Sequence, residues 1–301
     1  MILDKSDVVA LRLCEERGWF ATEGEIARVG LAPAEYPERL RKLSALGVVR
    51  AFKTMLVVPP LLGGDWVRAV VLANAKRALG VANALASRLP FVSEIVLNSG
   101  LPEGIGPNLA LLFYSRDFAH EAEFIKATPG LEYHEVCKVS EYSFPVALPL
   151  SSDEKALVRY LVEHPDSDVA GAGAGLGRNP TWVKAKLDRL LWSEVNRSGV
   201  VQVVPEVNWS QVENFGHFHF LLETGHRPDQ LERLVAEEGF SVVLGGRPYQ
   251  NRYVQVEADL WGIGKLLDSV AYLNQIAGIR VAGVLWNREA VINSKWVAGL
   301  L

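Results

Sequence analysis

The pair His217 and His219 is the part of this sequence whose residue types and spacing best suit chemistry. One residue separates them in an apolar segment, and alternate residues of a strand share a face, so both imidazoles would point to the same side of a sheet. Such a pair could ligate a metal or a haem iron, with His226 or His134 nearby. It supplies only two ligands, however, and no cysteine or carboxylate spacing completes the set, so we predict no metal site. The alternative is a pair of surface or interface histidines.

A polar loop in the second half provides a second group of candidates. Segment 245–252 contains two arginines, and a guanidinium group can bind a carboxylate through two parallel hydrogen bonds. The corresponding segment of the first half is 97–104, and both segments could equally consist of turn residues. The residues predicted to bind a small ligand are Asn98, Asn108, Arg247, Tyr249 and Arg252. If the chain is an enzyme, the predicted catalytic groups are His134, His217, His219 and Arg247.

A duplicated sequence must position these residues. A shift of 147 residues brings Pro33 onto Pro180 and Arg39 onto Lys186, and this register holds without a gap for nearly sixty positions. A fixed register through helical and extended segments alike indicates a duplicated unit. Two fused copies would form a dimer within one chain, and its halves could diverge.

Each copy begins with the order of elements typical of a winged helix-turn-helix. In the first copy we expect helices at 5–17 and 22–28, a third helix that starts near Pro33, and an extended wing that ends at Pro60. Pro37 would lie about one turn inside the third helix, where it removes a backbone donor. That position argues against a regular third helix in this copy.

The second copy repeats this order at 153–164, 170–177 and 179–190, with a wing at 195–205. Asn179 followed by Pro180 is a favourable start for the third of these helices. Its second segment has glycine at every other position from 171 to 177, and each glycine costs about 1 kcal/mol in a helix interior. We therefore expect an irregular second helix.

After each wing, alternating strands and helices indicate a βαββαβ unit. The strands are expected near 66–73, 92–98, 107–115 and 131–140, and again near 215–223, 240–245, 252–259 and 279–287. The predicted fold class is α+β: two repeats, each a winged helix-turn-helix followed by a ferredoxin-like domain, which together form an intrachain pseudo-dimer. Its predicted parts are winged helix 1 (1–58), ferredoxin-like domain 1 (59–144), a linker (145–152), a degenerate winged helix 2 (153–206) and ferredoxin-like domain 2 (207–301).

Segments 26–33 and 39–50 resemble the Lrp/AsnC family, whose members join a DNA-binding winged helix to a ligand-sensing ferredoxin-like domain. The resemblance implies a transcriptional regulator in which a small effector changes the spacing of two DNA-reading heads. The alternative interpretation is that the lysines and arginines of these helices only form a solvated helix face. The residues expected to contact DNA phosphates are Arg39, Arg41, Lys42, Arg50, Lys53, Arg178, Lys184, Lys186 and Arg189.

Residues 107–144 also resemble the siroheme decarboxylases, which share this architecture and are sometimes fused in tandem, with an active cleft between the halves. The similarity lies in the strand that follows Pro107 and in the segment 133–136. Residues 94–100 replace the His- and Arg-rich stretch of that family. This resemblance implies a decarboxylase, with a porphyrin or haem precursor as ligand, as the alternative function. A non-catalytic, partner-binding scaffold is a third alternative.

The composition is that of an ordinary soluble globular protein, with 49% apolar and 22% charged residues. A net charge of -4 argues against a chain that coats nucleic acid non-specifically. No apolar run reaches the ~18 residues of a membrane span, the N-terminus is too polar for a signal peptide, and Cys14 and Cys137 make no disulfide framework. We expect a cytoplasmic protein without a cofactor, whose partners are duplex DNA and a small effector but no membrane, with further self-association left open.

Overall fold

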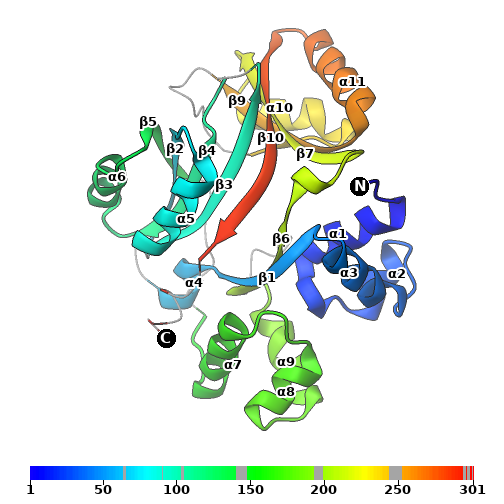
Figure 1. Ribbon diagram of the computed structural model, residues 1–301. Coiled ribbons are helices and arrows are strands. Elements are labelled where there is room, and N and C mark those ends of the chain that lie inside the picture. Colours follow the sequence, from blue (N-terminus) through cyan, green and yellow to red (C-terminus); the bar gives the residue numbers. More distant parts are fainter. Residues whose placement is uncertain are drawn as a thin grey trace. The chain divides into compact units, whose positions relative to one another are not determined.

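The computed structural model describes residues 1–63, 66–89, 91–102, 105–139, 148–192, 199–243, 253–293, 296, 299 and 301. Figure 1 shows its helices and strands. The chain forms two compact units that are interleaved in sequence: one comprises Met1–Leu3, Val67–Tyr142 and Trp209–Val291, and the other Asp4–Trp66, Ser143–Asn208 and Ile292–Leu301. Both ferredoxin-like parts therefore belong to the first unit, and both winged helices belong to the second.

The second unit starts with the helices and the wing that were predicted for the first copy. Asp4 caps the first helix through a capping box, in which its carboxylate accepts from the Asp7 backbone N–H at 2.7 Å and the Asp7 carboxylate accepts from the Asp4 N–H. Apolar residues at helical spacing, such as Leu11 and Leu40, form the core. The elements are α1 (Lys5–Arg17), η1 (Gly18–Phe20), α2 (Glu23–Arg28), α3 (Glu35–Ala45), β1 (Val49–Leu56) and α4 (Val58–Leu62).

The second copy of the winged helix repeats this order with α7 (Ser152–Glu163), α8 (Val169–Leu176), α9 (Pro180–Leu190) and β6 (Val201–Val207). Side chains of Ser151 and Asn179 cap α7 and α9. The wings of the two copies pair: β1 and β6 form a two-stranded antiparallel sheet with Met55 opposite Gln202. The second unit is thus built from both halves of the chain.

The glycine-rich helix α8 is regular, so the prediction that it would be irregular was wrong. Close packing explains two of its glycines. A Cβ on Gly173 would lie 2.8 Å from the carbonyl oxygen of Arg178, and a Cβ on Gly175 would overlap the ring of Tyr160 in α7. The absence of side chains therefore lets α8 approach its neighbours closely, which offsets the conformational cost of glycine.

Helix α3 begins at Glu35 rather than near Pro33. Pro37 is consequently the third residue of this helix, within the first turn, where a backbone N–H has no acceptor inside the helix. The prediction that Pro37 removes a needed donor was wrong, because it placed the start of the helix two residues too early.

The first unit contains one eight-stranded sheet in the order β5-β2-β4-β3-β10-β7-β9-β8. Within each copy this is the fourth, first, third and second strand, the arrangement of a ferredoxin-like fold, so the predicted fold is confirmed. The strands are β2 (Val67–Asn74), β3 (Val92–Leu101), β4 (Leu109–Ser115), β5 (Glu132–Val139), β7 (Phe215–Thr224), β8 (Ser241–Val242), β9 (Val254–Trp261) and β10 (Ile279–Ile292).

Strands β3 and β10 lie side by side and join the two copies, as the cyan and red strands of Figure 1 show. The two ferredoxin-like parts therefore share one continuous sheet. Pairing of β3 with β10 satisfies backbone groups that an exposed edge strand would leave without partners.

Each copy in the first unit keeps its own core between the sheet and its helices. Leu85 and Leu111 belong to the core of the first copy, and Phe220 and Leu273 to that of the second. Alternate residues of the same strands point to the opposite face, where the candidate site lies. The helices are α5 (Ala78–Arg88), α6 (Phe118–Lys126), α10 (Pro228–Val235) and α11 (Gly262–Gln275), with short 3-10 turns η2 (Trp209–Gln211) and η3 (Ala236–Glu238). None of the helices that the structure describes is long and apolar enough to cross a membrane.

Candidate active-site pocket

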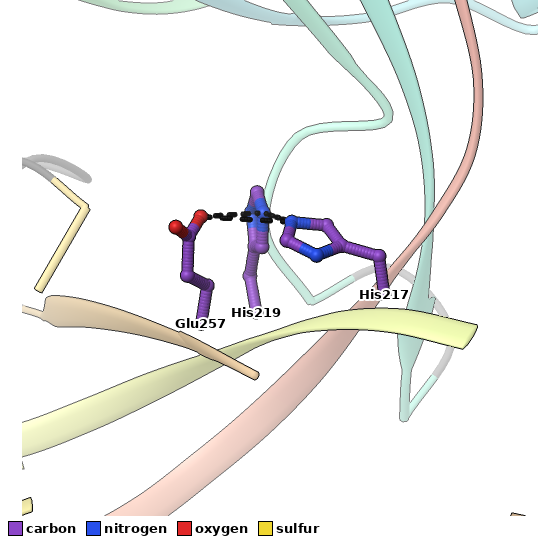
Figure 2. Close-up of side chains that lie close together, drawn as sticks. All are labelled: His217, His219 and Glu257. Carbon is purple, nitrogen blue, oxygen red and sulfur yellow. Dashed lines mark hydrogen bonds and ion pairs between the residues drawn. The ribbon is translucent and has the colours of Figure 1, made fainter. Parts of the chain in front are cut away.

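Strands β7 and β9 bring four polar side chains together. His219 stands directly across from Glu257, and His217 stands across from Asp259. Figure 2 shows the side chains of His217, His219 and Glu257 converging above these strands. Because strand side chains alternate, these four residues share one face, while neighbours such as Phe220 point into the core on the other.

The cluster is connected by short contacts. Nδ1 of His217 is 2.8 Å from Oδ1 of Asp259, and Nε2 of His217 is 2.8 Å from Nε2 of His219. Oε2 of Glu257 lies 3.5 Å from Nε2 of His217 and 3.6 Å from Nε2 of His219. Three ligand-type atoms therefore meet at one place, and the carboxylate of Asp259 orients one of the imidazoles.

The two imidazoles have opposite protonation preferences. Burial by itself lowers the pKa of a histidine, but the hydrogen bonds and negative charges of Asp259 and Glu257 outweigh it and raise the pKa of His217 to about 10. Burial and the adjacent His217 cation lower the pKa of His219 to about 3. At neutral pH, His217 is therefore the charged member of the pair and His219 the neutral one.

A cavity of about 330 Å³ lies against this cluster. Its second wall comes from the first copy, with Arg68 on β2 and with Glu94 and Asn98 on β3. The volume is within the ~300–1,000 Å³ of small-molecule sites. Residues of both copies thus line one pocket. Its apolar lining is formed by Val70, Leu72, Val96, Ala110, Leu112, Val242 and Val243.

Glu94 is the acidic residue of the second wall. Burial raises the pKa of its carboxyl group, and the nearby positive charge of Arg68 acts in the opposite direction without cancelling the effect. A carboxyl group that holds its proton more tightly than usual can serve as a general acid.

Two amides in the pocket have buried oxygen atoms without a partner. The Oδ1 atoms of Asn98 and Asn287 form no hydrogen bond with any residue that the structure describes. An unpaired buried polar group costs about 1–3 kcal/mol. Both residues line the cavity, so a bound molecule with suitable donors would remove this cost.

The predicted ligand-binding residues separate into three groups. Asn98 lines the pocket. Asn108 instead joins two segments of the first copy: its Oδ1 accepts from the Ala75 N–H and its Nδ2 donates to the Ala75 carbonyl, both at 2.9 Å. Arg247, Tyr249 and Arg252 lie outside the described residues.

The predicted catalytic histidines are only partly brought together. His217 and His219 meet in the pocket, whereas only the backbone of His134 is described, within β5. Nε2 of His226 lies 2.9 Å from the Ala277 carbonyl oxygen. Arg247, the fourth member of the predicted catalytic set, falls outside the described part of the chain.

Sequence reasoning missed the polar pocket residues Arg68, Glu94, Gln255, Glu257 and Asn287, and also Asp259, which contacts His217 beside the pocket. A signal for three of them was present, because Gln255, Glu257 and Asp259 alternate along a strand and must share a face. What the sequence does not give is the register that places Glu257 opposite His219. Arg68 and Glu94 carry no distinguishing spacing.

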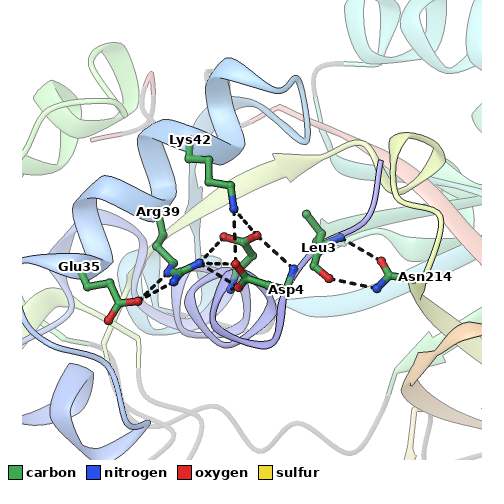
Figure 3. A network of polar contacts seen from close by, with 7 residues as sticks. Leu3, Asp4, Glu35, Arg39, Lys42 and Asn214 are labelled. Atoms are coloured by element: carbon green, nitrogen blue, oxygen red, sulfur yellow. Dashed lines mark hydrogen bonds and ion pairs between the residues drawn. The ribbon is translucent and has the colours of Figure 1, made fainter.

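Several cations predicted to contact DNA form ion pairs inside the winged helix. Figure 3 shows Arg39 and Lys42 of α3 reaching the start of α1. Nη1 of Arg39 lies 2.8 Å from Oδ1 of Asp7, and Nζ of Lys42 lies 2.6 Å from Oδ2 of the same carboxylate. Asp7 is almost completely buried. Arg39 also pairs with Asp4 and Glu35.

The second copy repeats these contacts at the corresponding positions. Nζ of Lys186 lies 3.2 Å and Nη1 of Arg189 2.5 Å from Oε1 of Glu154, which is 3% exposed. A shift of 147 residues relates Asp7 to Glu154, Arg39 to Lys186 and Lys42 to Arg189. These cations hold α3 or α9 against the start of the first helix of their copy, in addition to any role on DNA.

The remaining predicted DNA contacts differ in their surroundings. Arg178 pairs with Asp153 at 3.1 Å, while Lys53 and Arg50 lie on the wing strand β1. Arg41 and Lys184 are exposed, and neither forms an ion pair with any residue in the described ranges. Arg41 and Lys184 are therefore the least constrained of the predicted phosphate contacts.

Solved structures similar to this chain fall into two groups. A siroheme decarboxylase aligns with a TM-score of 0.47 and 14% identity over 98% of this chain and 97% of that chain. Its complex with an iron-uroporphyrin III analogue aligns with the same TM-score and identity over 97% and 96%. An AsnC family transcriptional regulator from Agrobacterium tumefaciens aligns over 50% of this chain and 98% of its own, with a TM-score of 0.31 and 21% identity. No protein-family profile and no curated protein matches the sequence. Both groups of proteins that the sequence resembles are present among the similar structures.

Proposed function

We propose that this chain is an enzyme that binds a small carboxylated molecule in the sheet pocket and removes a carboxyl group as CO₂. The observation that carries the proposal is the combination of residues in one cavity: a guanidinium group, Arg68, and a carboxyl group with a raised pKa, Glu94, beside the unpaired amide oxygens of Asn98 and Asn287. Arg68 would orient the substrate through a carboxylate. The amides would select its donor groups.

Glu94 would supply the proton that the reaction consumes. When the bond between the substrate and its carboxylate breaks, CO₂ leaves and the bonding electron pair stays on carbon. The Glu94 carboxyl proton moves to that carbon, and the resulting carboxylate regains a proton from solvent. The apolar lining, which includes Val70 and Val96, favours this step because an apolar wall solvates a compact carboxylate poorly.

The resemblance of the sequence to siroheme decarboxylases makes iron-uroporphyrin III the first ligand to test. We expect it to bind the full chain with a shift of its visible absorption. Mass spectrometry of a reaction with siroheme should show product molecules that have lost CO₂. If these tetrapyrroles neither bind to the chain nor lose CO₂, the tetrapyrrole assignment is contradicted.

Two pocket variants separate binding from chemistry. Glu94→Gln should retain ligand binding and slow CO₂ loss by at least about 100-fold, because general acid catalysis contributes about 10²–10⁴-fold. Arg68→Met should weaken binding. Arg41→Gln is the matched control, since Arg41 is exposed in the other unit. Equal rates for Glu94→Gln and the unaltered chain would rule out the proposed role of Glu94.

Binding of duplex DNA is a second candidate function, favoured by the exposed cations Arg41 and Lys184 on α3 and α9. Neutralising these two residues leaves the ion pairs of Asp7 and Glu154 intact. A change of Arg39 or Lys186, by contrast, would break one of those ion pairs. We expect the double variant Arg41→Gln, Lys184→Gln to reduce the salt dependence of duplex binding, measured by fluorescence anisotropy. Binding that keeps the same salt slope would exclude these residues as phosphate contacts.

A further inference from the structure

We propose that His217, His219 and Glu257 form a binding site for a divalent transition metal and that Zn²⁺ fits it best. The proposal goes beyond the decarboxylation suggested above and can be tested without any substrate. The sequence predicted no metal site because the histidine pair offers two ligands. Strand β9 supplies the third, since Glu257 lies directly across from His219.

The three ligand atoms already have the spacing of a coordination shell. Nε2 of His217, Nε2 of His219 and Oε2 of Glu257 form a triangle with sides of 2.8, 3.5 and 3.6 Å. Zinc is bound at about 2.0–2.2 Å by such atoms, and a point about 2.05 Å from all three lies about 0.7 Å from their plane. In a regular tetrahedron the metal stands one third of a bond length above the plane of three ligands, which is also about 0.7 Å, whereas an octahedral ion would need about 1.2 Å.

Each of these ligands has its other polar atom engaged. Nδ1 of His217 contacts Asp259, Nδ1 of His219 contacts the amide of Gln255, and Oε1 of Glu257 accepts from Ser241 at 3.2 Å. Contacts of this kind orient metal ligands, and a carboxylate behind an imidazole raises its basicity. Rotation of the Gln255 amide by half a turn presents its oxygen to an N–H on His219. Because the other polar atoms are engaged elsewhere, the three converging atoms can bind one ion once His217 has released the proton that it holds at neutral pH.

The nature of the ligands and of the surroundings selects the metal. Two imidazoles and one carboxylate suit zinc and neighbouring transition metals, whereas Ca²⁺ and Mg²⁺ prefer oxygen ligands. His217, His219 and Glu257 also line the 330 Å³ cavity. A fourth coordination position can therefore be taken by water or a ligand, as in zinc sites with three protein ligands.

The test uses the full chain after treatment with a chelator. Calorimetric titration with Zn²⁺ should give one equivalent per chain. Titration with Co²⁺ should produce the intense visible absorption of a tetrahedral cobalt ion. A stoichiometry well below one would overturn the site, and a weak, octahedral cobalt spectrum would overturn the tetrahedral assignment.

Variants connect the metal to these residues. His219→Gln and Glu257→Gln should each weaken Zn²⁺ binding by more than about 100-fold, and Asp259→Asn, which removes only an orienting contact, by about 10–100-fold. His120→Gln, an exposed histidine on α6, should bind as the unaltered chain does. Circular dichroism and the melting temperature verify that each variant folds. Unchanged affinity in folded His219→Gln would refute the site.

Measurements on one variant distinguish a failure of the metal proposal from a failure of the decarboxylase proposal. Glu94→Gln should bind Zn²⁺ with unchanged affinity, because Glu94 is not among the three ligands. Loss of CO₂ release in that variant with normal metal binding would support both proposals. Stoichiometric metal binding by a chain that does not act on any tetrapyrrole would support the metal site and contradict the tetrapyrrole assignment.

Discussion

Asp7 and Glu154 each bind two cations that lie 32 and 35 residues further along the chain. The cations could be identified from the sequence as a cluster at helical spacing, and their equivalence between the copies followed from the repeat. Their partners could not, because an acid in the first turn of a helix is already explained by capping. Charge patterns show where cations gather, whereas packing of the two helices decides which carboxylates reach them.

Removal of the Glu154 carboxylate should destabilise the chain in a pH-dependent way. Burial alone would raise the pKa of Glu154, but hydrogen bonds from Arg189, Ser151 and Lys186 outweigh this and lower it from its usual 4.5 to about 2. A lowered pKa gives stability that is fully present above about 4.5 and is lost as the pH falls towards 2. We expect Glu154→Gln to lower the free energy of unfolding at pH 7 by about 2–3 kcal/mol, measured with urea.

The pH dependence distinguishes this effect from a simple loss of packing. The difference in the free energy of unfolding between Glu154→Gln and the unaltered chain should shrink by more than half between pH 7 and pH 3. Over this range the carboxylate of the unaltered chain loses most of the stability that its lowered pKa provides. Glu163→Gln, an exposed change in the same helix, should alter stability by less than about 0.5 kcal/mol. A deficit that stays constant from pH 7 to pH 3 would show that the charge is not responsible.

At the scale of elements, helix α8 offers two glycines for which the same substitution should have opposite effects. Alanine is favoured over glycine in a helix by about 1 kcal/mol. At Gly171 the added Cβ would lie 3.4 Å from Asp168 Oδ1, an ordinary contact, so Gly171→Ala should stabilise the chain by up to about 1 kcal/mol. At Gly175 the Cβ would overlap Tyr160, so Gly175→Ala should destabilise it by about 1–3 kcal/mol. Thermal unfolding of both variants tests this, and stabilisation by both would disprove the packing role of Gly175.

Most elements could be predicted because their signals are local. Helix α1 was expected at 5–17 and spans Lys5–Arg17, since its cap and its apolar spacing lie within the segment itself. The start of α3 and the regularity of α8 were predicted wrongly, because one depends on the turn before the helix and the other on the ring of Tyr160. The pocket was harder still. His217 and His219 are local in sequence, but Glu257 joins them only through the register of β7 and β9.

At the scale of the whole molecule, the repeat predicts two copies but not how their parts associate. The contacts group the two winged helices in one unit and the two ferredoxin-like parts in another. Two strand pairings produce this grouping: β1 with β6, and β3 with β10. They join segments far apart in sequence, and no local periodicity encodes them. This arrangement lets the two copies diverge while they share one pocket, with Arg68 and Glu94 from one copy and His217 and His219 from the other.

The winged helices should consequently lose stability together, and Gly18 offers a test. Gly18 has a φ of 54°, and a Cβ at this position would lie 2.6 Å from the carbonyl oxygen of Val203 in the other copy. Gly18→Ala should therefore cost about 2–3 kcal/mol. Hydrogen exchange should become faster in α1 and in β6 alike, although the change is in the first copy only. Gly24→Ala, where nothing lies within 4 Å of the added Cβ, should leave exchange in β6 unchanged. Faster exchange confined to α1 and η1 would mean that the two winged helices unfold independently.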